Sequence, residues 1–330
     1  MIRFGVIGTN KITEEFIKAA RETEEFKLTA VYSRTIEKAE EFAAKYSIPG
    51  TYTDLSEMAQ SHEVDAVYIA SPNSFHAEQA ILCMNHGKHI LCEKPIASNV
   101  RELRAMISAA QANGILLMEA LKSTLLPNFR AVQESLPKIG QVRRYFASYG
   151  QYSSRYDAYK QGTILNAFNP VFSNGALMDL GIYCIYPMVV LFGKPELIKA
   201  TGLLLESGVD GEGSILAQYK EMEAVITYSK ITDSHLPSEI QGEQGTILIN
   251  KINHLDQVEI RRKSAAIENL TRPQSNNSMV YEVREFIDLL NRNKLESPTN
   301  SHENSLIAME IMDEVRKQIG LVYPADEESG

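Results

Sequence analysis

The first 120 residues alternate short apolar runs with helical stripes. Between the runs, apolar residues recur every three or four positions, as at Ile36, Ala39 and Phe42, which indicates amphipathic helices. The runs themselves are almost continuously apolar, which is typical of strands buried on both faces. They cover residues 2–7, 28–33, 66–70, 89–92 and 115–119. This alternation predicts right-handed crossovers and a doubly wound parallel sheet.

The hydrophobic pattern changes after Pro127, where short runs of β-forming residues are separated by residues typical of turns. The runs cover residues 142–149, 197–205, 214–219, 224–229, 239–241, 246–249 and 258–261. Such spacing predicts a largely antiparallel open sheet. We expect one helix at 175–192 and two more near 280–290 and 303–319. The predicted domains are therefore 1–120 and 121–330, and the last helix is free to pack back on the first domain.

Composition narrows the functional class. The 330 residues carry a formal net charge of −9, which argues against nucleic acid or an anionic membrane as the main partner. We find no apolar run near the roughly 18 residues of a membrane helix and no signal peptide. Three cysteines without a CxxC pair exclude a disulfide framework and a zinc ribbon. We expect a cytoplasmic protein.

A glycine turn follows the first strand. The dinucleotide fingerprint places glycines there so that the backbone can approach a pyrophosphate at a helix N-terminus. Gly8 supplies the tight turn, whereas Asn10 and Thr13 replace the second glycine and the third small residue. Asn tolerates a left-handed backbone, so the turn is retained. The candidate cofactor-binding residues here are Gly8, Thr9, Asn10, Lys11 and Ile12; the alternative is an ordinary strand–helix turn.

Ser33, Arg34 and Thr35 stand at the end of the second strand, where an acidic residue would bind the ribose of NAD. An arginine suits the 2′-phosphate of NADP, and Lys38 lies one helical turn further on. Basic residues are unfavourable at a helix N-terminus, so this cluster favours an anion. The alternative is a pair of solvated basic side chains.

Two further segments carry candidate chemistry. Glu93, Lys94 and Pro95 end the fourth predicted strand, at the edge where open α/β sheets bind ligands. Asp179 and Tyr183 are four residues apart and share one face of an apolar helix, which is costly unless they meet partners. The alternatives are a surface lysine beside a glutamate and a structurally hydrogen-bonded helix face.

These segments together resemble the glucose–fructose oxidoreductase/inositol dehydrogenase (Gfo/Idh/MocA) family over nearly the whole chain. The resemblance rests on the glycine turn, Ser71-Pro72-Asn73 with His76, Glu93-Lys94-Pro95, and residues 175–183. It implies a Rossmann domain, a C-terminal α/β domain and nicotinamide-dependent redox chemistry. It also implies that Ser71, Pro72, Asn73, His76, Glu93 and Lys94 contribute to cofactor binding. Tyr183, where many members have histidine, resembles the branch of dimeric dihydrodiol dehydrogenase and xylose dehydrogenase, which commonly uses NADP.

We therefore expect an NAD(P)-dependent oxidoreductase, with NADP(H) favoured and NAD(H) as the alternative, acting on a sugar, polyol, cyclic diol or related hydroxyl or carbonyl substrate. Tyr183 would be the acid/base, Lys94 the polarising cation and Asp179 a hydrogen-bond acceptor for a substrate hydroxyl, without a metal. Whether Lys94 or Tyr183 delivers the proton stays open. A nicotinamide-dependent glycosidase of the same fold and a non-catalytic dinucleotide sensor are the rival hypotheses. The apolar strands of the second domain predict a homodimer.

Overall fold

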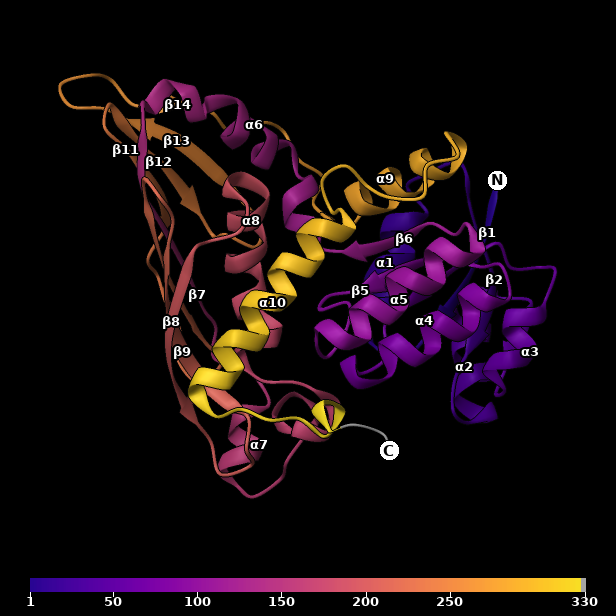
Figure 1. Ribbon diagram of the computed structural model, residues 1–330. Helices are drawn as coiled ribbons and strands as arrows, with labels where there is room; N and C mark the ends of the chain where they lie inside the picture. The colour runs from indigo at the N-terminus through magenta and orange to yellow at the C-terminus, as the bar shows by residue number, and fades with distance from the viewer. Residues whose placement is uncertain (328–330) are drawn as a thin grey trace. The chain divides into compact units, whose positions relative to one another are not determined.

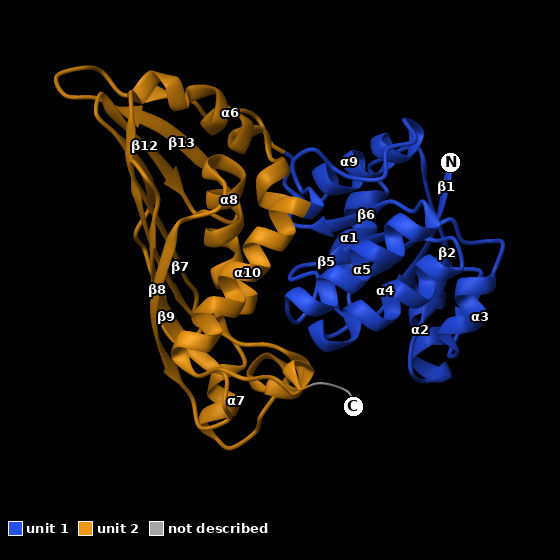
Figure 2. Cartoon of the chain, in the orientation of Figure 1, with its two compact units in different colours: residues 1–121, 275–302 blue, residues 122–274, 303–330 orange. Residues whose placement is uncertain are grey.

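The computed structural model describes residues 1–327 and divides into two compact units (Figure 2). The first unit comprises residues 1–121 and 275–302, and the second comprises residues 122–274 and 303–330. The expected division after residue 120 thus lies one residue from the observed one. Residues 275–302, however, were expected in the second domain and belong to the first unit.

The first unit contains a six-stranded sheet in the order β3-β2-β1-β4-β5-β6, with every neighbouring pair parallel (Figure 1). This is the strand order of a Rossmann sheet, as predicted. The strands are β1 (Ile2–Ile7), β2 (Phe26–Tyr32), β3 (Gly50–Tyr52), β4 (Ala66–Ile69), β5 (His89–Glu93) and β6 (Leu117–Ala120). The helices are α1 (Lys11–Ala20), α2 (Ile36–Tyr46), α3 (Leu55–Gln60), α4 (His76–Asn85), α5 (Val100–Asn113) and α9 (Val280–Asn291).

Helix α9 explains why the chain returns to the first unit. The ring of its Phe286 lies 5.8 Å from that of Phe4 on β1, so its apolar face completes the core beside the sheet. Just before the helix, Asn277 Nδ2 donates to Glu15 O of α1 (2.9 Å). The apolar stripe of α9 was visible in the sequence, but nothing local indicated which unit it covers.

The second unit contains an eight-stranded sheet in the order β14-β13-β12-β11-β7-β10-β9-β8. Only the central β7–β10 pair is parallel, so the predicted largely antiparallel sheet is confirmed. The strands are β7 (Val142–Gly150), β8 (Leu197–Leu204), β9 (Asp210–Gln218), β10 (Glu223–Ser229), β11 (Ser238–Gly242), β12 (Gly245–Asn250), β13 (Gln257–Arg261) and β14 (Glu268–Asn269). The helices are α6 (Pro127–Ser135), α7 (Tyr156–Lys160), α8 (Ile182–Phe192) and α10 (His302–Ile319), which begins at the last residue of the first unit.

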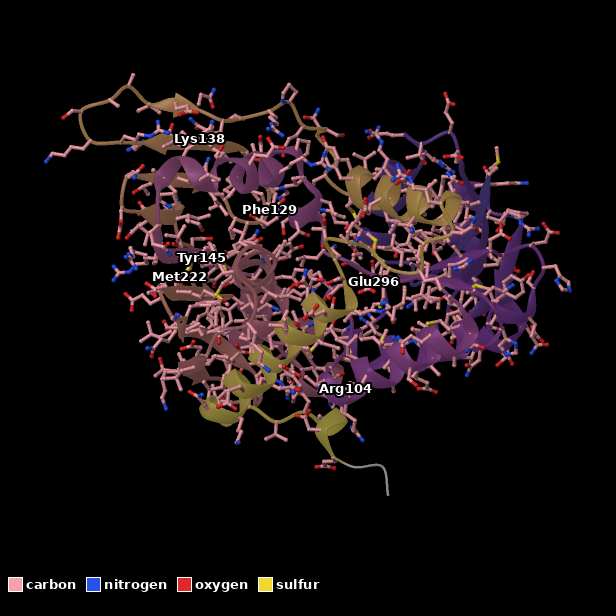
Figure 3. All side chains as sticks on the ribbon, turned by 45° about the horizontal axis from the view of Figure 1, so that its top comes forward. Arg104, Phe129, Lys138, Tyr145, Met222 and Glu296 are labelled. Carbon is pink, nitrogen blue, oxygen red and sulfur yellow. The ribbon has the colours of Figure 1, made fainter. Side chains whose placement is uncertain are left out.

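Helices α8 and α10 lie on one face of this sheet (Figure 1). Tyr145 of β7, labelled in Figure 3, donates from its hydroxyl to Cys184 O of α8 (2.9 Å) and so ties the sheet to that helix. By length and composition Pro170–Phe192 is apolar enough to cross a membrane, which the sequence analysis did not expect. Because 72% of its most apolar window is buried within the chain, we interpret it as a core helix of the second unit.

The helix expected at 175–192 begins differently from the prediction. Leu177–Gly181 forms a π-helical turn (η6), and α-helical geometry starts only at Ile182. Single π turns inside helices occur frequently at functional sites. Asp179 lies within this turn, and Tyr183 follows in the first turn of α8.

Candidate active site

The glycine turn lies between the ends of β1 and β4. Gly8 has φ of +103°, and a Cβ there would lie 2.9 Å from Ala70 O. Both the backbone angle and the lack of space therefore require glycine at this position. Gly8 therefore supplies the tight turn that the first glycine of a dinucleotide fingerprint provides.

Asn10 differs from the expectation. Its backbone is extended (φ −93°) rather than left-handed, and its side chain caps helix α1. Asn10 Oδ1 accepts from Ile12 N (3.0 Å) and Thr13 N (3.1 Å), while its Nδ2 donates to Ala70 O (2.6 Å). Thr13 is buried, and its hydroxyl also lies within hydrogen-bond distance of Asn10 Oδ1 (3.3 Å). The two substitutions in the fingerprint thus form a cap that joins the turn to the end of β4.

The second strand ends with the predicted basic cluster. Ser33 is buried, and its N–H donates to Tyr52 O of β3 (3.1 Å). Arg34 and Lys38 are exposed, and within residues 1–327 neither forms an ion pair. Thr35 is the N-cap residue of α2 but makes no capping hydrogen bond from its side chain. An exposed cluster of positive charge therefore lies beside an uncapped helix N-terminus, an arrangement suited to a phosphate.

His76 joins the loops that follow β4 and β5. One ring nitrogen lies 2.9 Å from Ser71 O and the other 3.0 Å from Pro95 O, and the ring is buried. Burial lowers the pKa of His76. Pro72 and Asn73 lead into the short helix η1 (Asn73–Phe75) on the same loop. Contact of these residues with a cofactor stays a prediction, but their loops are fixed to one another.

Two buried glutamates fix the backbone on either side of Lys94. Glu93 is buried; its Oε1 accepts from Tyr68 OH (2.5 Å), and its Oε2 accepts from Lys94 N (3.2 Å). Ile96 N donates to the buried Glu119 Oε1 (3.0 Å). The half-buried Lys94 thus leaves the carboxyl end of β5 from a rigid backbone, and the Lys94–Pro95 peptide bond is cis.

In the second unit, Asp210 holds the start of the π turn. Its Oδ1 accepts from Ala176 N (3.0 Å) and its Oδ2 from Leu177 N (2.7 Å). Gly175 has φ of +148°, and a Cβ there would collide with Asp210 Oδ1. Asp210 is completely buried, and this desolvation raises its pKa to about 6, against the opposing influence of the two amides and Lys230.

Asp179 and Tyr183 both lie on the segment that Asp210 anchors. Asp179 Oδ2 forms an ion pair with Lys230 Nζ at 3.0 Å. The ring of Tyr183 packs edge-on against that of Tyr149 of β7, with 5.7 Å between centroids. Asp179 and Tyr183 lie on one segment, as their spacing predicts, whereas Lys230 was not among the predicted residues. The sequence pattern could have identified this lysine. Every second residue of β10 is buried, at Ala224, Ile226 and Tyr228, and Lys230 is the next position in this series. A lysine at a buried position needs a partner for its charge.

The predicted residues thus fall into two sets. The first unit gathers the β1, β2, β4 and β5 loops at the carboxyl edge of its sheet, because the strands are parallel. The second unit holds Asp179 and Tyr183. Among residues 1–327, no three or more His, Cys, Asp or Glu side chains group as metal ligands. These features define a dinucleotide-binding α/β protein with a separate unit that carries polar side chains on a π turn.

Comparison with known proteins extends this assignment. Residues 2–121 match the model of the Gfo/Idh/MocA oxidoreductase family with an NAD-binding Rossmann fold, and residues 130–248 match that of a Gfo/Idh/MocA C-terminal domain. The chain belongs to this family. It is 58% identical to the NADP(+)-dependent scyllo-inositol 2-dehydrogenase IolU of Bacillus subtilis, over 99% of this chain and 100% of the relative.

Two further proteins are similar over nearly their whole length. Trans-1,2-dihydrobenzene-1,2-diol dehydrogenase of Mus musculus is 32% identical, covering 98% of this chain and 99% of the relative. The structure of KijD10, a 3-ketoreductase from Actinomadura kijaniata with NADP and TDP-benzene, superposes with a TM-score of 0.84 at 25% identity, covering 96% and 98%. The predictions of the family, of its fold and of an NAD(P)-dependent oxidoreductase are confirmed.

Proposed function

We propose that this protein is an NADP-dependent dehydrogenase that acts on a secondary hydroxyl of a cyclic polyol. The observation that carries the proposal is the 58% identity, over the full length of both chains, with an NADP(+)-dependent scyllo-inositol dehydrogenase. The exposed Arg34 and Lys38 beside the start of α2 support the cofactor choice independently, since they suit a 2′-phosphate.

The loops of the first unit fit a dinucleotide. Gly8 gives the turn its positive φ and its close approach to Ala70 O. Arg34 and Lys38 supply positive charge, and Ser71 belongs to the loop held by His76. The bound nicotinamide would accept a hydride from the carbinol carbon. The chain's own residues would orient the cofactor from the β1, β2, β4 and β5 loops, which one sheet edge brings together.

The proton of the reacting hydroxyl requires a base. We assign this role to Tyr183, with Lys94 as the cation that stabilises the developing oxyanion. A tyrosine with an ordinary pKa near 10 is almost entirely protonated at neutral pH, so it needs a nearby cation that lowers its pKa before it can accept a proton. Asp179 would accept a hydrogen bond from a neighbouring substrate hydroxyl, which favours substrates with at least two hydroxyls.

The free face of the eight-stranded sheet supports the proposal of a homodimer. Leu203 of β8 and Leu216 of β9 are each at least half exposed. A hollow of about 450 Å³ lies beside Leu203, lined largely by small polar side chains from β7, β9 and β10. A second copy of the chain would bury these leucines. We also propose a cytoplasmic location, since NADP-dependent chemistry of this kind is supplied with cofactor there.

The test is a substrate panel with both cofactors. Purified protein is assayed with scyllo-inositol, myo-inositol, an aldose and a cyclic trans-diol, each with NADP⁺ and NAD⁺, by the absorbance of the reduced nicotinamide. We expect the highest kcat/KM for a cyclitol with NADP⁺. Cofactor that stays bound without net reduction while a glycoside is cleaved would indicate a glycosidase instead. Cofactor binding without turnover of any substrate would indicate a sensor.

A further inference from the structure

Lys230 is a buried charge that follows directly after β10. Its side chain is 2% exposed, and its ammonium group has three acceptors within hydrogen-bond distance. These are Asp179 Oδ2 at 3.0 Å, Ala167 O at 3.2 Å and Asn174 Oδ1 at 3.3 Å. An ammonium has three donors, so each can be used. The nitrogen also lies 5.4 Å from the centroid of the Phe168 ring.

The two partners of the ion pair differ sharply in exposure. The side chain of Asp179 is 38% exposed, whereas that of Lys230 is 2% exposed. The lysine therefore approaches the carboxylate from the protein interior, and the carboxylate stands between the lysine and the solvent. A molecule bound from the solvent side would meet Asp179 and not Lys230. Any effect of Lys230 on such a molecule must pass through Asp179.

Lys230 also joins Asp179 to a second segment. Ala167 and Asn174 belong to the connection between β7 and the π turn, so a single ammonium fixes three points of the chain. Asn174 Oδ1 accepts from Lys230 Nζ and from Gly175 N (2.9 Å). The Asn174 side chain thus links Lys230 to the backbone just before the π turn.

We propose that Lys230 is a positioning residue that holds the Asp179 carboxylate oriented toward a hydroxyl of the substrate. The inference rests on the proposed function, in which Asp179 accepts that hydrogen bond. It extends that function by assigning to Lys230 part of the preference for substrates with a second hydroxyl next to the reacting one. Asp210, which is buried and lies beside Tyr228 and Tyr323, is also near the lysine.

The test is a double-mutant cycle on kcat and KM with the best cyclitol and NADP⁺. Lys230→Met keeps most of the stem and removes the charge, and Asp179→Asn keeps the shape and removes the partner charge. We expect Lys230→Met to lower kcat/KM by about 10- to 100-fold, mainly through KM for the polyol, with KM for NADP⁺ within about twofold. The double variant should be no worse than Asp179→Asn alone, because both changes remove one interaction.

Lys194→Met is the matched control. Lys194 lies in the same unit and pairs with Glu310 at 2.7 Å, but its side chain is 62% exposed. This variant should retain the parent kinetics. Thermal unfolding of all four variants identifies those that fold, and if Lys230→Met does not, Lys230→Gln replaces it.

Three results would overturn the proposal. Losses that multiply in the double variant would show that Lys230 acts independently of Asp179. A fall of kcat with an unchanged KM for the polyol and a higher KM for NADP⁺ would indicate a general structural defect. A parent protein inactive on every polyol would remove the proposed function and this inference with it. If the parent is active and the losses of the two single variants multiply, only the role of Lys230 is excluded and the proposed function stands.

Discussion

Replacing Asp210 by asparagine should change how the free energy of unfolding depends on pH. Asp210 is fully buried at the start of the π turn, and burial raises its pKa from 3.8 to about 6. In the unfolded chain the carboxyl group ionises near its ordinary pKa. Between these two values the native state binds more protons than the unfolded state, so the stability contributed by Asp210 falls as pH rises. Asparagine does not titrate and removes this dependence.

The magnitude follows from the two pKa values. One pKa unit corresponds to about 1.4 kcal/mol, so the full penalty of ionising buried Asp210 is about 3 kcal/mol. It is absent well below pH 3.8 and complete well above pH 6. Between pH 5 and pH 8, the stability of Asp210→Asn relative to the parent should therefore increase by about 1–2 kcal/mol. Loss of one of the two backbone hydrogen bonds adds an offset that does not vary with pH.

Urea unfolding followed by circular dichroism measures this difference, since the chain contains no tryptophan to report by fluorescence. Asp65→Asn is the control. Arg3 hydrogen-bonds Asp65 and lowers its pKa below 3.8, so its contribution is complete above pH 5. The relative stability of Asp65→Asn should then be constant from pH 5 to pH 8. A flat profile for Asp210→Asn, or one that falls with pH, would refute the reasoning.

Four other predictions concern the cofactor, the chemistry and the assembly. Arg34→Ala should weaken NADP(H) binding by about 1–3 kcal/mol and leave NAD(H) unchanged in calorimetric titrations; equal losses for both would disprove the phosphate contact. Tyr183→Phe and Lys94→Met should each lose at least about 10²-fold in kcat while binding cofactor within about tenfold of the parent, and full activity in both would remove these assignments. Gly8→Ala should cost about 1–3 kcal/mol of stability and weaken cofactor binding, because a Cβ meets Ala70 O; an unchanged melting temperature contradicts this. Light scattering should show a dimer that Leu216→Glu converts to monomer, and a monomeric parent would exclude the proposed interface.

The hydrophobic periodicity of the sequence was sufficient to predict most of the helices and strands. Strand β1 and helix α9 stand out because a buried strand is almost continuously apolar and a half-buried helix repeats every three or four residues. Those patterns depend only on a residue's own neighbours in sequence. The same holds for the Gly8 turn and the Arg34 cluster, whose positions at strand ends follow from the order of the elements. Short pieces such as β3, with three residues, carry too few positions to show a period.

The rest required the tertiary structure because it depends on partners distant in sequence. Asn10 caps α1 rather than adopting a left-handed turn, since Ala70 O is available to its amide. Whether α9 covers the first or the second unit depends on where Phe4 lies once the sheet has formed. Asp179 could be assigned to a helix face from its spacing, but its ion pair with Lys230, 51 positions later, arises only because β10 runs beneath the π turn. A local pattern thus determines which side chains are buried, and the path of the chain decides which of them meet.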